Sequence, residues 1–392
     1  MQLEASSLPH PDAASAAHSE QCAAYIRARI AHAGGSISFA EFMQHALYAP
    51  GLGYYAAGAT KFGSAGDFVT APEVSPVFGA VVARQCAQVL QAIGGGSILE
   101  IGAGSGRLAV DLLTTLDEMG VMPEHYDILE VSADLRQRQE TLLKKEVGDI
   151  ADRVRWLDAL PQNYTGVIVA NEVLDALPVE RFVKRTVLQQ QHVQATTDGF
   201  CIVEKDAPEH TAGRVAAIEA DIGHAFATGY VSEVSLGLSD WVTSLVDSLE
   251  KGAALLFDYG LSRREYYAKD RSDGWLRCHF RHHAHNDPLI LTGIQDLTAW
   301  VDFTSVAEAA VAADAEILGY VSQAHFLLNG GLAEELEKMT TLSQQQQTEL
   351  SAAVKLLTLP GEMGEHFKCF GFSKGACPTP AAFDTADRTH TL

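Results

Sequence analysis

The residues best suited to chemistry in this chain lie in one short segment, 98–106, which reads Ile-Leu-Glu-Ile-Gly-Ala-Gly-Ser-Gly. Three alternating glycines, Gly102, Gly104 and Gly106, follow an apolar run that contains Glu100. Glycine allows positive φ angles and lets a ligand approach bare peptide groups. A helix that begins after such a turn also presents its unpaired N–H groups to the ligand. The segment therefore predicts a strand–turn–helix unit that binds a nucleotide-like ligand, with an ordinary structural turn as the alternative.

The spacing of the glycines distinguishes between classes of nucleotide ligand. A dinucleotide fingerprint requires G-x-G-x-x-G, and Arg107 occupies the position of the third glycine. The chain instead reads E-x-G-x-G-x-G, with Glu100 just before the turn. This pattern resembles motif I of the S-adenosylmethionine-dependent methyltransferases, where the turn surrounds a carboxypropyl group rather than a pyrophosphate. The resemblance implies S-adenosyl-L-methionine as the cofactor and makes a dehydrogenase the least favoured enzyme.

An acidic residue at the end of the next strand is the second part of such a site, because it accepts hydrogen bonds from ribose hydroxyls. Glu130 ends the run 126–130, and leucines at helical spacing in 107–119 predict the intervening helix. Glu130 is therefore the predicted ribose ligand, with a solvated strand-end carboxylate as the alternative. Asp158 follows a further apolar run, where it either accepts from the adenine amino group or is a surface acid.

Two further polar groups follow predicted strands, and ligands of open α/β sheets bind at the carboxyl ends of strands. Asn171, Glu172 and Asp175 come after one apolar run, and Asp258 ends another. If the segment after Asn171 is helical, Glu172 and Asp175 share a face and could hold a guanidinium in a planar fork. The alternatives are that Asp175 braces a loop and that Asp258 accepts backbone N–H groups instead of orienting a substrate.

Composition and charge exclude several partners. The net charge is −22, from 50 acidic and 28 basic residues, so neither nucleic acid nor anionic lipid is expected to bind. No apolar run approaches the ~20 residues of a membrane span. Residues 1–20 resemble neither a secretory signal nor a transit peptide, so we expect a cytoplasmic protein. The six cysteines lack the spacing of a disulfide framework or a zinc ribbon.

A histidine-rich stretch suggests a metal site but lacks the pattern that one needs. Transition-metal sites require fixed spacing and supporting acids, and no matching set lies elsewhere in the sequence. We therefore expect a polar loop on the substrate side, and no metal. The residues concerned are Cys278, His279, His282, His283 and His285.

Strand and helix patterns alternate from residue 97 onward, which predicts a doubly wound, mostly parallel sheet with helices on both faces. The expected strands lie at 97–101, 126–130, 153–157, 166–170, 253–260, 317–320 and 367–372, and the expected helices include 75–93, 107–119 and 133–146.

The chain outside this alternation divides by composition. Residues 1–20 are expected to be a disordered tail, 21–95 an N-terminal helical and lid region, and 376–392 a C-terminal tail. The core, 96–375, contains two insertions, 179–249 and 262–300, the first of which begins with a β-ribbon. In the N-terminal region a helix is expected from about Cys22, and Ser38 with Glu41 predicts a capping box for the next one.

The chain is similar to the MidA family of S-adenosylmethionine-dependent methyltransferases over roughly residues 36–375. A mitochondrial member of that family is a protein arginine methyltransferase that assists the assembly of respiratory complex I. The motifs that resemble the family lie, besides the glycine turn, at 48–55, 66–79, 171–178, 258–260, 277–288, 293–298 and 363–368.

The resemblance implies a Rossmann-like class I fold with a seven-stranded sheet, in which segment 66–79 covers the cofactor and Asp67 and Thr70 help to close the donor site. It also implies that Glu172, Asp175 and Asp258 act on a protein arginine, with a respiratory-complex subunit as candidate substrate. The alternatives are a non-catalytic assembly factor that binds S-adenosylmethionine and a methyltransferase for a small molecule. No oligomeric state is predicted.

Three positions depart from the family pattern. Ala103 stands where the family often has proline, a change that leaves the turn feasible. Val173 and Leu174 stand where the family often has aromatic residues, which alters the expected acceptor pocket. A fold and a donor site do not fix a substrate, so the acceptor depends on these pocket residues.

Titration calorimetry with S-adenosylmethionine, S-adenosylhomocysteine and NAD tests the predicted donor site. The first two ligands are expected to bind with micromolar affinity, and NAD is not, because Arg107 replaces the third glycine of the dinucleotide pattern. Micromolar binding is expected to be lost in Glu130→Ala and replaced by weaker binding, since the substitution removes the acceptor for the ribose hydroxyls. Binding of NAD, or unchanged affinity in the Glu130 variant, would contradict the prediction.

Overall fold

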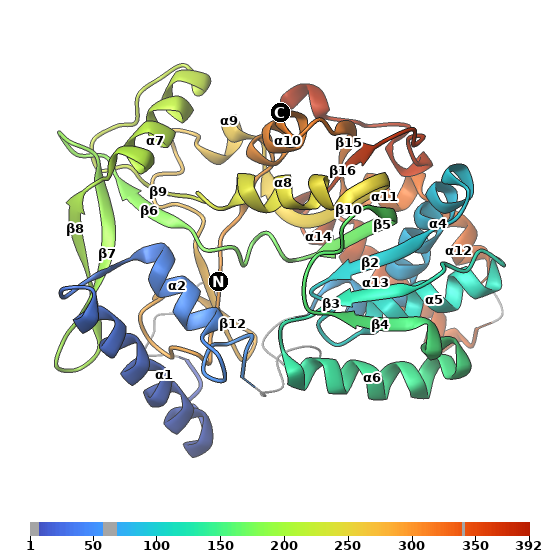
Figure 1. Ribbon diagram of the computed structural model, residues 1–392, viewed down its shortest axis with the longest axis horizontal. Helices are drawn as coiled ribbons and strands as arrows, with labels where there is room; N and C mark the ends of the chain where they lie inside the picture. Colours follow the sequence, from blue (N-terminus) through green and yellow to red (C-terminus); the bar gives the residue numbers. More distant parts are fainter. Residues whose placement is uncertain (1–7, 58–68, 339–341) are drawn as a thin grey trace. The chain divides into compact units, whose positions relative to one another are not determined.

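A computed structural model describes residues 8–57, 69–338 and 342–392, and the chain forms two compact units (Figure 1). The first unit comprises Met1–Phe68, Leu174–Leu238 and Leu261–Asp302, and the second comprises Val69–Val173, Ser239–Gly260 and Phe303–Leu392. Each unit is therefore built from segments that are distant in the sequence. Among the described residues, no helix combines the length and apolarity that a bilayer crossing requires.

The second unit contains a twisted central sheet with a path of seven strands. Along the path the order is β15-β16-β10-β5-β2-β3-β4. Neighbours from β10 to β4 are parallel, whereas β16 runs antiparallel to both β10 and β15. The strands are β2 (Ser97–Ile101), β3 (Tyr126–Leu129), β4 (Val154–Leu157), β5 (Tyr164–Asn171), β10 (Leu249–Leu261), β15 (Glu316–Ser322) and β16 (Phe367–Lys374).

This strand order confirms the doubly wound α/β fold. The chain proceeds from β2 through β3 to β4 on one side and then returns to place β5 on the other side of β2. The order therefore reverses between β2 and β5, and ligands of such sheets bind in the crevice at the carboxyl ends of the strands at that point. The glycine turn directly follows β2, so the fold puts it beside this crevice.

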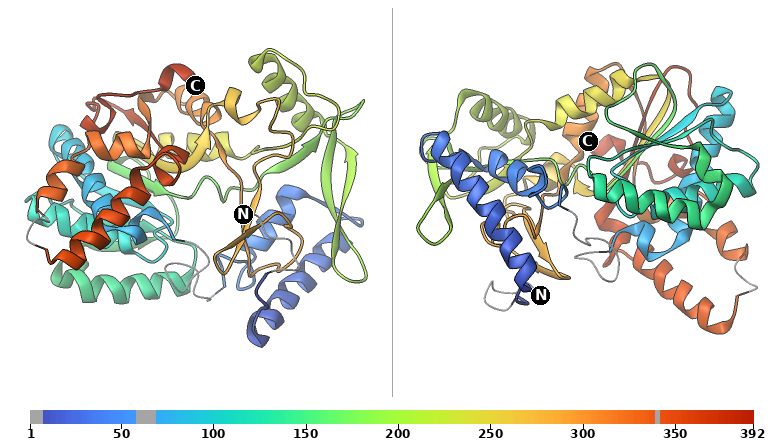
Figure 2. Two further views of the ribbon diagram at one scale, coloured as in Figure 1. Left: turned by 180° about the vertical axis from the view of Figure 1, so that it is seen from behind. Right: turned by 60° about the horizontal axis from the view of Figure 1, so that its bottom comes forward.

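Helices of the second unit pack on its sheet (Figure 2), and apolar side chains of helices and strands form one buried cluster. In α5 (Arg107–Glu118), for example, Leu108, Leu112, Leu113 and Leu116 are all buried. The other helices are α3 (Ala71–Val74), α4 (Pro76–Ile93), α6 (Ala133–Val147), α8 (Leu238–Ser248), α10 (Phe303–Ala312), α11 (Gln323–Asn329), α12 (Leu332–Lys338), α13 (Gln344–Thr358) and α14 (Met363–His366), with short 3-10 turns at Gly148–Arg153, Ala381–Phe383 and Thr389–Thr391.

The first unit contains two small antiparallel sheets with helices beside them. One sheet has the order β1-β7-β6-β9 with β8 paired to β7, and the other has the order β12-β11-β13. Their strands are β1 (Ile37–Ser38), β6 (Glu180–Val183), β7 (Gln189–Ala195), β8 (Phe200–Asp206), β9 (Val231–Val234), β11 (Arg277–Phe280), β12 (His283–His285) and β13 (Asp296–Thr298). The short strand β14 (Val301–Asp302) belongs to neither sheet, since it pairs with β10. The helices are α1 (Ala13–His32), α2 (Phe39–Tyr48), α7 (Glu209–Ile222) and α9 (Arg263–Tyr266).

Local sequence signals account for several boundaries of these elements. The capping box expected at Ser38 is present, because the Ser38 side chain accepts from the Glu41 N–H and the Glu41 side chain accepts from the Ser38 N–H. The β-ribbon expected after residue 179 forms as β6, β7 and β8. By contrast, α1 begins at Ala13 within the stretch expected to be a disordered tail, because Asp12 caps its first N–H groups.

The C-terminal segment 376–392 also differs from the expected tail, because it packs onto the sheet. Phe383 is 4% exposed, and Ala382 is fully buried. A Cβ atom at Gly319 or Gly371 would lie 2.5 or 2.6 Å from the Phe383 ring, so these glycines make room for it. Burial of one aromatic ring thus holds the end of the chain against β15 and β16.

Gly166→Ala tests how closely the central strands approach each other. Gly166 has a φ of +147°, and an added Cβ would lie 1.8 Å from the Ser97 carbonyl oxygen. The substitution is expected to destabilise the fold by about 3 kcal/mol or more, measured by urea unfolding, because backbone atoms must separate. Gly361→Ala is the matched control: an added Cβ there meets nothing within 4 Å, and stability should stay within about 1 kcal/mol. Equal effects would contradict the prediction.

Candidate functional site

The glycine turn connects β2 to α5 through three left-handed residues. Gly102, Gly104 and Gly106 have φ angles of +67°, +55° and +86°, a region that side chains rarely adopt. The Gly102 N–H donates to the Leu129 carbonyl (3.0 Å), which fixes the turn against β3. A Cβ at Gly102 would lie 3.2 Å from Val173, so the glycine also gives space at the crevice. The turn thus has the backbone conformation that the sequence pattern requires.

Glu100 lies on β2 just before the turn and is 3% exposed. The Tyr126 hydroxyl donates to Glu100 Oε2 (2.7 Å). Burial raises the pKa of Glu100 to about 7, and the nearby carboxylates of Glu130 and Asp111 add to the rise. Glu100 therefore retains a proton up to near neutral pH, which lets it donate as well as accept.

Glu130 follows β3 and is 5% exposed. The Ser132 N–H donates to Glu130 Oε1 (2.9 Å), and Gln139 Nε2 donates to Glu130 Oε2 (3.2 Å). Arg136 Nε donates to the Glu130 carbonyl (2.6 Å), which fixes the backbone as well. Val131, the next residue, is 76% exposed, an unusual value for valine. The structure therefore holds the predicted ribose acid in place beside an exposed apolar side chain that sequence reasoning missed.

Asp158 lies at the same edge of the sheet, after β4. Its side chain is 90% exposed and forms an ion pair with Arg136 (2.8 Å), the residue that also contacts the Glu130 carbonyl. The nearby Trp156 donates its indole N–H to Gln139 Oε1 (2.9 Å). The structure thus brings Asp158 close to Glu130 through Arg136, and its role toward adenine stays a prediction.

Glu172 follows β5 in a strained backbone conformation. Its φ is +54°. Its N–H donates to the Phe257 carbonyl (2.9 Å), and its Oε1 accepts from Asn171 Nδ2 (3.2 Å). The condition for a shared helical face is not met, because residues 172–177 form bends and a turn. A positive φ at Glu172 and the restriction before Pro178 both oppose a helix. Glu172 and Asp175 therefore do not share a helical face.

Asp258 lies at the carboxyl end of β10 and is fully buried. Its carboxylate accepts from the Tyr259 N–H (2.9 Å), and it stands opposite Lys368 of β16 in the strand register. Lys368 is 4% exposed. Opposite charges that face each other across two paired strands stabilise the pairing of those strands. The geometry thus favours the backbone-accepting alternative for Asp258, while its catalytic role stays a prediction.

Asp175 belongs to the first unit and is 4% exposed. Its carbonyl accepts from the Ala299 N–H (2.9 Å), and the Tyr55 hydroxyl donates to Asp296 Oδ1 (3.0 Å). Burial raises the pKa of Tyr55 well above its usual range, and the charges of Asp296 and Asp175 add to this. Asp175 therefore lies within an acidic group that sequence reasoning did not assemble, although Tyr55 and Asp296 fall in motifs of the resemblance.

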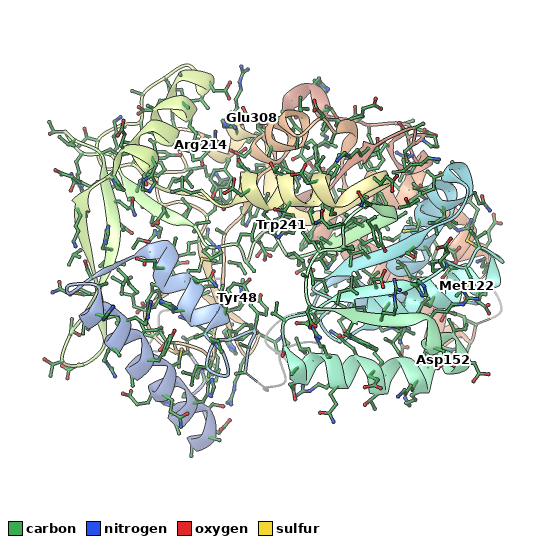
Figure 3. All side chains as sticks on the ribbon, viewed as in Figure 1. Tyr48, Met122, Asp152, Arg214, Trp241 and Glu308 are labelled. Carbon is green, nitrogen blue, oxygen red and sulfur yellow. The ribbon has the colours of Figure 1, made fainter. Side chains whose placement is uncertain are left out.

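An aromatic side chain supports the segment that contains Asp175. Tyr48, at the end of α2 (Figure 3), donates its hydroxyl to the Ala176 carbonyl (3.0 Å). Its ring stacks on that of Tyr55, with 5.5 Å between centroids. The two tyrosines thus fix the backbone next to Asp175.

The segment expected to close the donor site is described in part. Asp67 lies outside the described residues. Thr70 is the N-cap of α3, and its carbonyl accepts from the Glu73 N–H (2.9 Å). Glu73 in turn accepts a hydrogen bond from the Ser105 hydroxyl in the glycine turn. The structure therefore connects the Thr70 segment to the turn through Glu73.

The histidine-rich stretch forms β11, β12 and the tight turn between them. Cys278 is fully buried, and burial lowers the pKa of His279 to about 4. Within the described part of the chain, no group of three or more histidine, cysteine, aspartate or glutamate side chains could hold a metal ion.

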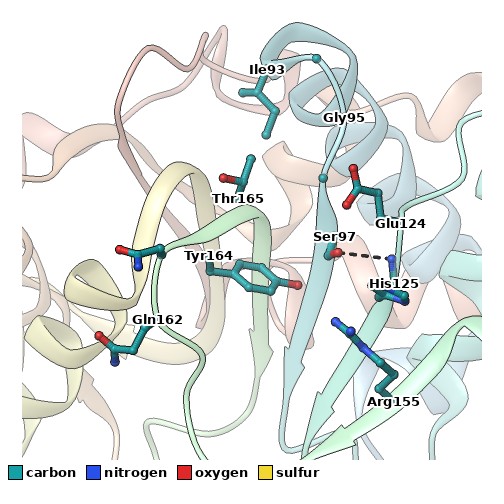
Figure 4. Close-up of a pocket in the computed structure, with 12 residues that line it drawn as sticks. Ile93, Gly95, Ser97, Glu124, His125, Arg155, Gln162, Tyr164 and Thr165 are labelled. Carbon is teal, nitrogen blue, oxygen red and sulfur yellow. Dashed lines mark hydrogen bonds between the residues drawn. The ribbon is translucent and has the colours of Figure 1, made fainter.

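A surface cavity of about 380 Å³ lies at the opposite edge of the sheet (Figure 4). It is found where β2 and β5 begin, near Ser97 and Tyr164, whereas the turn and the candidate carboxylates follow the strand ends. Arg155 in its wall is already paired with the buried Asp127 (2.7 and 3.0 Å). The cavity is therefore separate from the candidate site.

Comparison with protein families gives a match to a family described as S-adenosyl-L-methionine-dependent methyltransferase, over residues 81–321. Among curated proteins, a mitochondrial protein arginine methyltransferase NDUFAF7 of Danio rerio is 28% identical over 375 residues, which cover 86% of this chain and 83% of that one. The human protein of the same name is 29% identical over 373 residues, covering 86% and 80%.

Solved structures extend the comparison to nearly the whole chain. A protein from Burkholderia thailandensis, crystallised with S-adenosyl-homocysteine, is 43% identical, with a TM-score of 0.94 over 98% of this chain and 100% of that chain. A native structure from the same organism is 42% identical, with a TM-score of 0.91 and the same coverage. The matched residues therefore include both the first and the second unit of this chain.

Glu100→Gln tests whether the buried acid beside the turn is protonated. The folded-state pKa of Glu100 is about 7 against an ordinary 4.5, so between these pH values the folded chain binds a proton that the unfolded chain has lost. The free energy of unfolding of the wild type therefore falls as the pH rises from 4.5 to 7, by on the order of 3 kcal/mol at most. Glutamine carries no charge, so urea unfolding should show the variant gaining on wild type from pH 4.5 to pH 7. A pH-independent difference would contradict this.

Proposed function

The chain belongs to this family of S-adenosyl-L-methionine-dependent methyltransferases, and on that premise we propose that it methylates an arginine side chain of a partner protein. The observation that most supports this proposal is Glu172, a carboxylate in a strained backbone conformation at the carboxyl end of β5, next to the point where the strand order reverses. Strained residues at such points are typically functional.

The described residues fit the cofactor. The left-handed glycines expose backbone at the turn, which suits the carboxypropyl group, and Glu130 presents a fixed acceptor that suits the ribose. Val131 offers an exposed apolar surface to the adenine, and Asp158 and Asn171 complete the proposed contacts. When bound, S-adenosylmethionine supplies an electrophilic methyl group on a sulfonium. The protein contributes mainly alignment and the exclusion of water.

The proposed acceptor is a guanidinium because carboxylates match its planar set of donors. Glu172 would hold and polarise the guanidinium, so that one nitrogen attacks the methyl carbon while the carbon–sulfur bond breaks and a carboxylate takes up the nitrogen's proton. Asp175 and Asp258 are proposed to assist in orienting the substrate. The names of the curated relatives, which are protein arginine methyltransferases, support the same class of acceptor.

A non-catalytic assembly role and a small-molecule substrate are the competing proposals. The NDUFAF7 relatives are named as enzymes, which favours catalysis over a purely binding role. A respiratory-complex subunit stays our candidate acceptor. The cytoplasmic location expected from the sequence also stays a prediction, since those relatives are mitochondrial.

Substitutions at Glu172 separate catalysis from folding. Glu172→Gln is expected to lower methyl transfer about 100-fold or more, because it removes the charge that polarises the acceptor, while S-adenosylhomocysteine binding is retained. Glu172→Gly should be equally inactive, but its stability should be unchanged or higher by about 1 kcal/mol, since glycine relieves the positive φ. The measurements are urea unfolding and transfer of labelled methyl groups into cellular proteins, followed by hydrolysis and detection of methylarginine.

The exposed Asp198→Asn provides the matched control, because it removes a carboxylate without touching the site. It should retain wild-type activity and stability. Full activity of Glu172→Gln would eliminate the proposed role of Glu172. Labelled methyl groups found only on small molecules would instead support the small-molecule alternative.

A further inference from the structure

Gln139 is a buried polar residue on the apolar face of α6. It is fully buried, between Leu135 and Leu143 one turn to each side, which are 5% and 0% exposed. Gln139 comes from neither the glycine turn nor the end of a strand, and none of the motifs discussed above includes it. A polar side chain in such a stripe is costly unless its hydrogen bonds are satisfied.

The Gln139 amide makes hydrogen bonds to three separate parts of the donor region. Its Nε2 donates to the Gly104 carbonyl in the glycine turn (2.9 Å) and to Glu130 Oε2 (3.2 Å), and its Oε1 accepts from the Trp156 indole N–H (2.9 Å). One side chain therefore connects the turn after β2, the acid after β3 and the strand β4.

The chemistry of these partners sets the orientation of the amide. The Gly104 carbonyl and the Glu130 carboxylate are acceptors, whereas the Trp156 indole N–H is only a donor. Exchanging the amide nitrogen and oxygen would place like groups against each other at all three contacts. The orientation is thus determined by the network, and Nε2 faces both Gly104 and Glu130.

Gly106 allows α6 to come close enough for these contacts. A Cβ at Gly106 would lie 3.3 Å from Gln139 Cγ, which is closer than most Cβ contacts, and 3.5 Å from Gln139 Cα. The last glycine of the turn therefore serves the packing of Gln139 as well as the backbone conformation. This accounts for a glycine at a position that also begins a helix.

We propose that Gln139 is a positioning residue that orients Glu130 toward the cofactor ribose and couples this orientation to the glycine turn. Ser132 and Gln139 each donate to a different oxygen of the Glu130 carboxylate, so together they fix the rotation of the carboxylate plane. Without Gln139, Oε2 loses the hydrogen bond from Nε2, and the carboxylate plane is held less firmly. The inference rests on the proposed donor site, in which Glu130 binds the ribose.

The readout is the ratio between the affinities of one protein for two ligands. Calorimetry is performed with S-adenosylhomocysteine and with its analogue that lacks the ribose 2′-hydroxyl. Wild type is expected to bind the analogue roughly 10- to 100-fold more weakly, because a hydrogen bond to a carboxylate is lost. Gln139→Met keeps the side-chain volume but removes the amide, and the ratio should fall to about twofold. Because both ligands meet the same protein, a general loss of stability cancels in the ratio.

Gln137→Met is the matched control, since Gln137 lies on the same helix with an exposed side chain. Its affinity ratio should equal that of wild type. If Gln139→Met does not fold, Trp156→Phe replaces it, because this change keeps an aromatic ring but removes the indole N–H that holds Gln139 Oε1. The ratio for Trp156→Phe should then lie between those of wild type and Glu130→Ala.

Two failures can be told apart. If Glu130→Ala keeps the wild-type ratio, Glu130 does not bind the ribose, and the proposed donor site fails together with this inference. In the other failure, the two ligands bind Glu130→Ala equally well, while Gln139→Met, or Trp156→Phe in its place, has the wild-type affinity ratio. The donor site then stands, and the positioning role of Gln139 is overturned.

Discussion

The close approach of β5 to β2 is the constraint on which the carboxyl edge of the sheet depends. Gly166 has no room for a Cβ beside Ser97, and this contact sets a register in which Ala170 pairs with Ile101. The residues that follow, Asn171 on one strand and the glycine turn on the other, therefore leave the sheet at the same level. A shifted register would separate the turn from the carboxylate that follows β5.

Neutral donors hold several carboxylates around the turn. Glu100 accepts from a tyrosine hydroxyl, Glu130 from an amide and a backbone N–H, and Glu172 from an amide. Asp111 is instead paired with Arg107, and Asp158 with Arg136. This arrangement fixes the geometry of the carboxyl groups through neutral donors. It also has a cost, which is visible in the pKa of about 7 at Glu100.

The sequence predicted the features that depend on local pattern: the glycine turn, the buried strands and the sheet that they form. It missed features that depend on distant contacts. Tyr55 and Asp296 meet across 241 positions, and Gln139 differs from a surface glutamine only through its partners. The early start of α1 had a local signal in Asp12, and the absence of a helix after Asn171 had one in Pro178. Those boundaries were predictable in principle, whereas the contacts required the fold.

Glu172 shows how the fold and the proposed chemistry depend on each other. A non-glycine residue at positive φ costs roughly 1–2 kcal/mol, and glycine would relieve that cost without disturbing the backbone hydrogen bond to Phe257. The strain persists because the β5–β10 pairing and the Asn171 amide hold the residue in place. A carboxylate that adds strain and not stability supports the role that we propose for Glu172. The same reasoning applies to Gln139, whose burial among leucines is offset by hydrogen bonds that serve the donor region.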